Sequence, residues 1–358
     1  MNFKSELKIN NSTISLSNPS YFIADIASNH DGDLNRAKEL IWLCKEAEAD
    51  AVKFQHFTAE GLISQKGFDG IENASHQSNW HKSVFDVFKD YELNRNWNLE
   101  LMEEAKKANI DFLTTPYDLE AVDELDQYLP AYKIGSGDIT YTDFIKTISR
   151  KNKPMLMATG ASDIADVERA VHSINKYNEK IVLMQCNTNY TNSLENFHYI
   201  NLNVLKLYTT MFPNVILGLS DHTPGHSTVL GAIALGARVI EKHFTDDNER
   251  IGPDHPFSMN PKSWKEMVER SRELEQSLGD GVKKIEKNEE KTAIIQRRAC
   301  YLKKSLKKGD ILKNDDVDFL RPATVNAIKP YEIINYIGKK INSSKEKGEV
   351  INKHDMGE

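Results

Sequence analysis

Short apolar runs rich in β-branched residues alternate along this chain with segments of helical periodicity, from about Tyr21 to His243. Strands that alternate with helices form a parallel sheet, and eight such repeats close it into a barrel. The sequence therefore predicts an α/β fold, a (β/α)8 barrel of the TIM type. The eight expected strands are Tyr21–Ile26, Ala51–Phe54, Asp111–Thr114, Ala131–Ile134, Pro154–Ala158, Ile181–Gln185, Val215–Leu219 and Arg238–Lys242.

Several segments between these strands carry apolar residues at helical spacing. The expected helices are Asp33–Glu48, Asn98–Ala108, Ile164–Tyr177 and Ser227–Leu235. An open doubly wound sheet is the alternative architecture, but no glycine-rich dinucleotide-binding turn follows the first strand. The number of strands favours the barrel.

Two stretches interrupt the alternation. Residues 56–95 form an insertion rich in His, Ser, Asn and aromatic residues, in which His76 and His81 are expected to act only as caps. A loop of this length after a barrel strand is more often a functional lid or side wall than disorder. A change of composition near residue 281 ends the expected barrel domain (1–281) and begins a Lys/Glu-rich linker (282–296) and a small, basic, β-rich domain (297–358). A domain of that size is expected to dock on another surface.

The composition restricts the class of protein. The chain is 39% hydrophobic and 28% charged, which permits a substantial core, and its formal net charge of -7 argues against a nucleic-acid partner. No apolar run approaches the roughly 18 residues of a membrane helix, and Met1–Ser20 lacks the apolar stretch of a signal peptide. The three cysteines show no zinc or redox pairing. We therefore expect a cytoplasmic protein with no membrane or nucleic-acid partner.

Two lysines lie inside apolar strands, where an unpaired ammonium group could not remain buried. They are Lys53 in AVKFQ and Lys133 in AYKIG. A structural ion pair with a nearby acid, such as Asp25 or Asp138, is one explanation. Two such lysines together with the glycine-flanked Ser136 favour a second one, an anion site for a small ligand that carries phosphate and carboxylate.

Two histidines, His222 and His243, follow consecutive strands and lie 21 residues apart. Reactive groups of barrel enzymes lie at the carboxyl ends of the strands, so these rings are expected to converge over the barrel mouth. Asp254 follows in a loop able to fold back across the site. Two imidazoles with carboxylates and water suit a divalent ion such as Mn2+, Fe2+, Co2+ or Zn2+. A structural role for each histidine is the alternative.

Several segments resemble the sialic acid synthase family in sequence, order and spacing. They are FIADIASNHDGDL (Phe22–Leu34), ADAVKFQ (Ala49–Gln55), PAYKIGSGD (Pro130–Asp138), ATG (Ala158–Gly160), GLSDHT (Gly218–Thr223), ALGARVIEKHFT (Ala234–Thr245) and GPDHPFSMNP (Gly252–Pro261). The tail, with KKSLKKGDILKNDDVDFLRPAT and KGEVI, resembles the antifreeze-like (SAF) domain that ends these enzymes. Each motif alone is weak, but together they cover nearly the whole chain.

The resemblance implies a metal-dependent condensation of phosphoenolpyruvate with N-acetylmannosamine or a related acetamido-hexose and water, which gives a nonulosonic (sialic-type) acid and phosphate. A legionaminic- or pseudaminic-acid synthase that uses a 6-deoxy-diacetamido hexose is the alternative within this chemistry. A metal-dependent hydrolase on the same fold and a degenerate, sugar-binding barrel lie outside it. The implied metal ion is Mn2+, with Co2+ or Mg2+ as alternatives.

The resemblance also assigns roles to residues of this chain. Those that match phosphoenolpyruvate contacts are Lys53, Lys133, Ser136 and Ser220, and Thr188 is the expected contact from the segment before Tyr190. Gln55, Tyr190 and Asp254 match sugar contacts, and His222 and His243 match the metal ligands. The catalytic residues that follow are Asp25, Lys53, Lys133, Asp138 and His222, with Asp25 or Asp138 as the group that transfers a proton.

Arg321, in the tail, matches an arginine that the SAF domain inserts into the barrel of a partner subunit. The resemblance therefore implies a domain-swapped homodimer. The chain also departs from the family pattern, because Asp25 stands where bacterial members have Glu and Ala158 replaces a serine. These departures and the insertion over residues 56–95 bear on the identity of the sugar substrate and not on the reaction class.

Overall fold

The computed structural model of the protein describes residues 1–68, 71, 77, 80 and 82–357. The chain forms two compact units, residues 1–279 and residues 280–358. Each unit has its own hydrophobic core. No helix in these described ranges is both long and apolar enough to cross a lipid bilayer.

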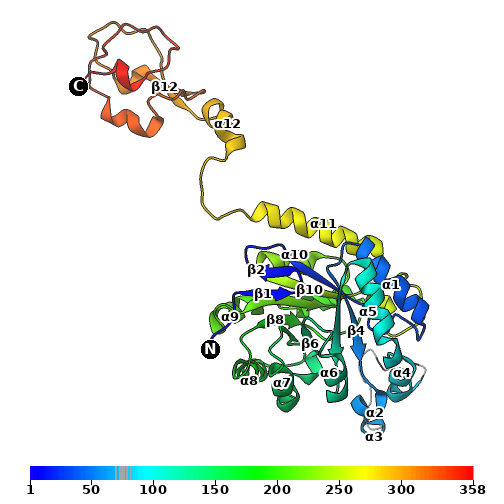
Figure 1. Ribbon diagram of the computed structural model, residues 1–358. Helices are drawn as coiled ribbons and strands as arrows, with labels where there is room; N and C mark the ends of the chain where they lie inside the picture. Colours follow the sequence, from blue (N-terminus) through cyan, green and yellow to red (C-terminus); the bar gives the residue numbers. More distant parts are fainter. Residues whose placement is uncertain (69–70, 72–76, 78–79, 81, 358) are drawn as a thin grey trace. The chain divides into compact units, whose positions relative to one another are not determined.

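Eight parallel strands form the centre of the first unit, and its helices lie around them (Figure 1). Their order in the sheet is β5-β4-β3-β10-β9-β8-β7-β6, so the first and last strands of the barrel, β3 and β10, are neighbours. The predicted barrel and its eight strands are confirmed, with boundaries within two residues of those expected. The strands are β3 (Tyr21–Asp25), β4 (Ala51–His56), β5 (Asp111–Pro116), β6 (Tyr132–Ile134), β7 (Met155–Ala158), β8 (Ile181–Cys186), β9 (Ile216–Asp221) and β10 (Ala237–His243).

Most of the longer helices follow a strand and bury one apolar face against the sheet, and the four predicted helices are confirmed. Side-chain caps fix several of their starts: Asp33 accepts hydrogen bonds from the first turn of α1, and Asn260 does so at α11. The helices are α1 (Leu34–Glu46), α5 (Asn98–Ala108), α6 (Leu119–Leu125), α7 (Thr142–Ser149), α8 (Ile164–Asn175), α9 (Val204–Met211), α10 (Ser227–Ala234) and α11 (Pro261–Leu278).

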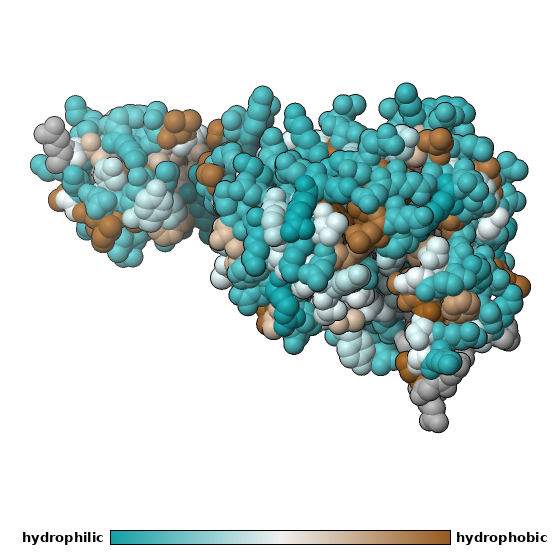
Figure 2. All heavy atoms as spheres, turned by 60° about the horizontal axis from the view of Figure 1, so that its bottom comes forward, coloured by the Kyte–Doolittle hydropathy of each residue, from teal (hydrophilic) through white to brown (hydrophobic). Residues whose placement is uncertain are grey.

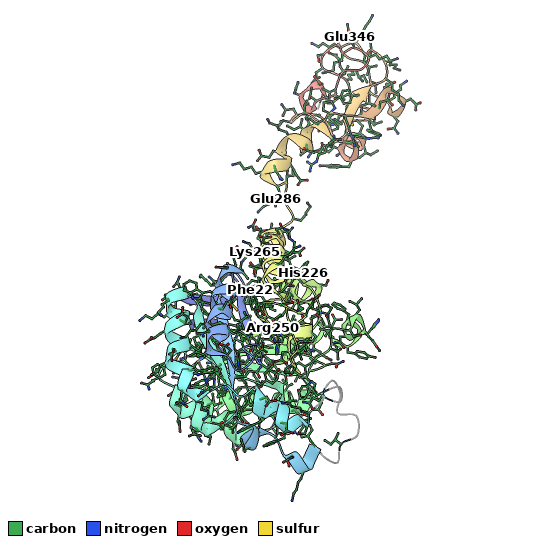
Figure 3. The ribbon with its side chains drawn as sticks, turned by 90° about the vertical axis from the view of Figure 1, so that its right-hand side faces the viewer. Phe22, His226, Arg250, Lys265, Glu286 and Glu346 are labelled. Atoms are coloured by element: carbon green, nitrogen blue, oxygen red, sulfur yellow. The ribbon has the colours of Figure 1, made fainter. Side chains whose placement is uncertain are left out.

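Helix α11 packs beside the first strand of the barrel. The guanidinium of Arg272 lies 4.9 Å from the ring centroid of Phe22, which Figure 3 labels on β3. Arg272 also donates a hydrogen bond to the carbonyl of Ser20. On the face drawn in Figure 2, hydrophilic residues predominate and hydrophobic ones occur in separate groups. The apolar residues of this unit are thus mainly used between the sheet and its helices.

An antiparallel hairpin precedes the barrel, formed by β1 (Glu6–Ile9) and β2 (Ser12–Ser15). Its residues Leu7, Ile9 and Ile14 are buried in one cluster with inward-facing residues of the barrel strands. The hairpin was not among the predicted elements. It supplies apolar side chains to the core at the start of the strands, which leaves the opposite, carboxyl end for polar chemistry.

The described part of the insertion is helical. It contains α2 (Ala59–Leu62), α3 (Gln65–Phe68) and α4 (Val84–Asp90), followed by a 3-10 turn at Arg95–Trp97. Lys89 of α4 pairs with Glu60 of α2, which ties the two helices together. The expected caps His76 and His81 lie outside the described residues.

The second unit contains a two-stranded antiparallel sheet, β11 (Ala299–Leu302) with β12 (Val317–Leu320), and several isolated β-bridges. A short helix, α12 (Glu290–Ile295), precedes the sheet. The core of this unit consists of small and medium apolar side chains, among them Cys300, Leu312, Ile328, Ile341 and Ile351. Arg321 directly follows β12 and is exposed.

Candidate active site

A cavity of about 410 Å³ lies among residues from the carboxyl ends of the barrel strands and from the loops that follow them. Most of the site residues expected from the sequence line it: Asp25, Lys53, Gln55, Lys133, Ser136, Tyr190, Ser220, His222, His243 and Asp254. Asp138 and Thr188 are not among the lining residues, and Arg321 belongs to the second unit. The structure therefore brings together nearly all of the expected chemistry within one unit.

Each of the two strand lysines is paired with a buried acid inside this cavity. Lys53 Nζ donates to Asp25 Oδ2 at 2.7 Å and to Thr115 Oγ1 at 3.0 Å. Lys133 Nζ donates to Glu241 Oε1 at 2.7 Å. The partner of Lys53 is one of the expected acids, whereas Lys133 pairs with Glu241 of β10 and not with Asp138. Lys53 Nζ also lies 3.8 Å from Glu241 Oε1, so the four side chains form one cluster.

The charges of this cluster stabilise one another. Burial alone would raise the pKa of Asp25, but the charges of Lys53 and His243 lower it to about 2. Burial likewise disfavours the charged form of Lys53, but Asp25 and Glu241 outweigh it and raise the lysine pKa. Asp25 and Glu241 thus keep the buried ammonium group of Lys53 charged.

The cluster retains hydrogen-bonding capacity for a ligand. An ammonium group has three N–H donors, and the structure uses two on Lys53 and one on Lys133. Glu241 Oε2 is buried without a hydrogen-bond partner. Ser136 Oγ faces the same cavity and accepts a hydrogen bond from Gly160 N at 2.9 Å. The unused N–H donors of Lys53 and Lys133 fit an anion that has more than one charged group.

The two histidines converge as expected, with ring centroids 5.3 Å apart. His222 Nδ1 lies 2.8 Å from the carbonyl oxygen of Asn187, so it donates there and Nε2 keeps its lone pair. Burial and, after it, the neighbouring His243 lower the pKa of His222 to about 3, which leaves its ring neutral. Tyr190 packs on His222 with ring centroids 4.3 Å apart.

His243 has acids on both sides: its Nε2 is 3.7 Å from Asp25 Oδ2, and its Nδ1 is 3.9 Å from Asp254 Oδ2. The Nδ1 atom is buried without a hydrogen-bond partner. This unpartnered nitrogen of His243 beside the neutral ring of His222 fits a divalent metal ion. Among the described residues no group of three or more His, Cys, Asp or Glu has the spacing of a metal site. Two protein ligands would leave coordination positions for substrate and water.

The two expected proton-transfer groups differ in position. Asp25 lines the cavity and accepts hydrogen bonds from Lys53 and Gln55. Asp138 ends a 3-10 turn after β6, and its Oδ2 is buried without a hydrogen-bond partner. Burial raises the pKa of Asp138 to about 6. Asp138 thus has a raised pKa, but it is not among the residues that line the cavity.

Sequence reasoning did not single out Glu241 as a site residue, and it also left out Thr115, Tyr117 and Cys186, which line the cavity. For Glu241 the signal was present. Side chains in a strand alternate between its two faces, so Glu241 points to the same side of β10 as His243, two residues later. The insertion, which was expected to form a lid or side wall, lines the cavity with apolar residues that the sequence analysis did not name: Leu62, Ile63, Phe68, Trp80, Val87 and Phe88.

The fold and the cavity together define a barrel whose mouth holds two buried lysine–acid pairs beside two convergent histidines. The profile of the NeuB family matches residues 40–283, and the chain belongs to this family. The N,N'-diacetyllegionaminic acid synthase of Campylobacter jejuni is 37% identical, over 92% of this chain and 98% of that protein. The human N-acetylneuraminate-9-phosphate synthase is 28% identical over 93% of this chain and 91% of that protein.

Among solved structures, the N-acetylneuraminic acid synthetase of Leptospira borgpetersenii in complex with citrate aligns with a TM-score of 0.70 and 26% identity. The alignment covers 81% of this chain and 96% of that one. The resemblance noted in the sequence is thus confirmed at the level of family and barrel. The chain is a carbon–carbon bond-forming synthase of the nonulosonic-acid type.

Proposed function

We propose that this enzyme condenses phosphoenolpyruvate with an amino-sugar aldehyde and water, at a divalent metal site, to give a nonulosonic acid and phosphate. The observation that carries the proposal is the cluster of two buried lysine–acid pairs next to the two histidines. Phosphoenolpyruvate has a phosphate and a carboxylate, which match the two ammonium groups. The family relatives that are named as acid synthases support the same reaction class.

In this mechanism Lys53 and Lys133 hold the anionic ends of phosphoenolpyruvate and direct its C3 toward the aldehyde carbon. His222 and His243 would hold a metal ion, which supplies Lewis-acid polarisation of the aldehyde oxygen when bound. Attack by C3 leaves a cationic centre at C2, which water captures, and the C–O bond of the tetrahedral intermediate then breaks to release phosphate. Asp25, ionised and on the cavity surface, is the better placed group to take the proton of that water.

The apolar wall of the cavity bears on the identity of the sugar. An apolar surface cannot pair with the hydroxymethyl group of N-acetylmannosamine but gains roughly 0.8 kcal/mol for each buried methylene-sized group. The wall formed by Leu62, Ile63 and Phe88 therefore suits a 6-deoxy-diacetamido hexose. Two relatives at 37% and 34% identity are N,N'-diacetyllegionaminic acid synthases. We favour this acceptor over N-acetylmannosamine.

A phosphate-release assay with a panel of hexosamines tests the reaction and the acceptor together. We expect release only when phosphoenolpyruvate and a sugar are both present, with kcat/KM about tenfold or more higher for the 6-deoxy-diacetamido hexose than for N-acetylmannosamine. Release from phosphoenolpyruvate alone would indicate a hydrolase. A preference for N-acetylmannosamine would contradict the acceptor and leave the reaction class intact.

Replacement of Lys133 tests the anion site. Lys133→Met should raise the dissociation constant of phosphoenolpyruvate about tenfold or more, because a charge-assisted contact of roughly 1.5–3 kcal/mol is lost. Since the change also leaves Glu241 without its partner, the variant Lys133→Met/Glu241→Gln separates the two effects. Lys151→Met, which breaks pairs with Asp123 and Asp126 away from the cavity, is the control. Unchanged affinity in calorimetric titration would return Lys133 to a structural role.

We also propose a domain-swapped homodimer in which Arg321 completes the site of a partner subunit. Arg321→Ala should then fold and dimerise normally but lose activity, chiefly through weaker sugar binding. Mixing Arg321→Ala subunits with His243→Ala subunits should restore part of the activity, because a hybrid dimer pairs one intact barrel with one intact arginine. Hybrids that are shown to form and remain as inactive as either parent would contradict the swapped arrangement.

A further inference from the structure

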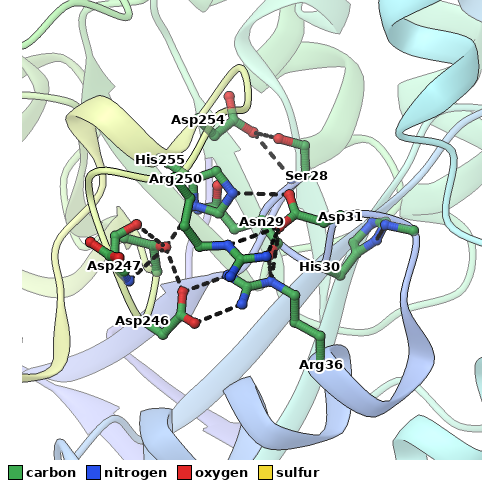
Figure 4. Close-up of polar contacts among 12 residues, drawn as sticks. Ser28, Asn29, His30, Asp31, Arg36, Asp246, Asp247, Arg250, Asp254 and His255 are labelled. Carbon is green, nitrogen blue, oxygen red and sulfur yellow. Dashed lines mark hydrogen bonds and ion pairs between the residues drawn. The ribbon is translucent and has the colours of Figure 1, made fainter.

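The segment between β10 and α11, residues 244–260, is fastened to the loop after β3 by the polar network drawn in Figure 4. His255 is the centre of this network and is fully buried. Its Nδ1 lies 2.7 Å from Thr245 Oγ1, and its Nε2 lies 2.9 Å from Asp31 Oδ1. Both ring nitrogens are therefore used, and the ring is held in one orientation between the two segments.

The second carboxylate oxygen of Asp31 connects the network to two arginines. Arg250 Nη2 donates to Asp31 Oδ2 at 2.8 Å, and Arg36 Nε lies 3.1 Å from the same atom. Arg36 also binds both carboxylate oxygens of Asp246, at 2.6 and 2.5 Å. Bidentate arginine–carboxylate pairs of this kind fix orientation as well as distance. The residues on the two sides thus form one clamp, which we define as Asp31, Arg36, Asp246, Arg250 and His255.

The clamp reaches the cavity through Asp254, the residue before His255. Asp254 Oδ2 accepts hydrogen bonds from Ser28 N at 3.1 Å and from Ser28 Oγ at 2.6 Å, and it lies 3.9 Å from His243 Nδ1. On the other side of Asp254, the backbone of Gly252 packs closely against the imidazole of His255. A Cβ at position 252 would be only 2.6 Å from His255 Cδ2. The ring of His255 therefore supports the backbone before and after Asp254.

Asp31 and His255 do not line the cavity, whereas Ser28, Asp254 and His243 do. We infer that Asp31 and His255 are positioning residues, which hold the Asp254 carboxylate on the sugar side of the site. The inference rests on the proposed function, in which Asp254 contacts the sugar. It predicts that replacing Asp31 or His255 weakens sugar binding only by displacing Asp254. It predicts no direct effect on the anion site of Lys53 and Lys133.

The test compares His255→Ala with the wild-type enzyme. We expect the KM for the sugar to rise about ten- to hundredfold, as for a displaced positioning group, and the dissociation constant for phosphoenolpyruvate to stay within about twofold. His255→Gln, which can keep one hydrogen bond, should recover part of the loss. The double variant His255→Ala/Asp254→Asn should be no weaker than Asp254→Asn, because the two changes act on one contact.

Arg95→Ala is the matched control, since it breaks a partly buried pair with Asp118 outside the clamp and should leave the sugar KM unchanged. Amide exchange of the substrate-free enzyme gives a readout independent of activity: exchange over residues 247–256 and over the loop after β3 should be faster in His255→Ala, and unchanged in the rest of the barrel. If His255→Ala does not fold, Asp31→Asn and His255→Gln replace it.

Equal losses in sugar and phosphoenolpyruvate binding would overturn the inference, and so would losses that add in the double variant. If exchange is faster in His255→Ala but the wild-type enzyme needs no sugar, the clamp holds the loop and the proposed function is wrong. If exchange is unchanged in His255→Ala while the wild-type enzyme needs both substrates, the proposed function stands and the positioning role of His255 is wrong.

Discussion

Removal of divalent metal ions with a chelator should abolish turnover, and Mn2+, or failing that Co2+ or Mg2+, should restore it. The expectation rests on the neutral ring of His222 and the unpartnered Nδ1 of His243, whose ring centroids are 5.3 Å apart in the cavity. His243→Ala should lower kcat about a thousandfold or more, because Lewis-acid stabilisation of a developing alkoxide contributes several kcal/mol. Phosphate release gives the rate, and titration of the metal-free protein with Mn2+ gives the loss of metal affinity.

His172→Ala is the control, because His172 is exposed on α8 and bonds only the backbone of its own helix in the described residues. It should leave both the rate and the metal affinity unchanged. Full activity in enzyme freed of metal would refute the metal site. In that event the two histidines would be hydrogen-bonding groups for the substrate.

Lys242→Met should lower the free energy of unfolding of the barrel by about 3–5 kcal/mol, because removal of one partner strands a buried charge. Lys242 Nζ donates to Asp221 Oδ2 and to the carbonyl of Thr223, and both ion-pair partners are almost wholly buried. Asp221 also accepts hydrogen bonds from the hydroxyls of Thr223 and Thr228. All four tryptophans lie in residues 1–279, so fluorescence during urea unfolding follows the barrel alone.

Two further measurements test whether the loss of stability comes from the stranded charge of Asp221. In the native protein burial raises the pKa of Asp221, but Lys242 outweighs it and the pKa is lowered, so the pair stabilises at neutral pH and less as pH falls through that lowered pKa. Without Lys242, burial dominates, and protonation of Asp221 should make the loss smaller at pH 5 than at pH 8. The double variant Lys242→Met/Asp221→Asn should recover much of the loss. Lys107→Met, at an exposed pair, should change stability by less than about 1 kcal/mol.

The barrel strands could be predicted because strands of a parallel sheet are buried on both faces and form short, continuous apolar runs. The N-terminal hairpin was harder to recognise. Each of its strands has only four residues, and the alternation of Leu7 and Ile9 with charged residues is too short to stand out in a polar segment. Its place in the core depends on the barrel interior, which no local pattern describes.

Site residues could be predicted where an unusual residue type stands at a sequence position expected to face a barrel active site. Lys53 and Lys133 are conspicuous because charge inside an apolar run needs a reason. The partner of Lys133 could not be identified in the same way: Asp138 is near in sequence, but Glu241 comes from a strand 108 residues later. The clamp around His255 likewise depends on contacts between residues more than 200 positions apart in the chain, such as His255 with Asp31 and Arg36 with Asp246, which only the folded barrel creates.

The position of Glu241, the partner of Lys133, on the last barrel strand has a consequence for biosynthesis. A ribosome adds about 5–20 residues per second, and the amino-terminal part of a chain emerges first. The half-barrel made first contains Lys133 but not Glu241, so its interior holds an ammonium group with no counter-charge, which cannot pack dry. We therefore expect a product truncated before β10 to stay open to proteases. The acid on the last strand makes completion of synthesis a condition for a stable interior.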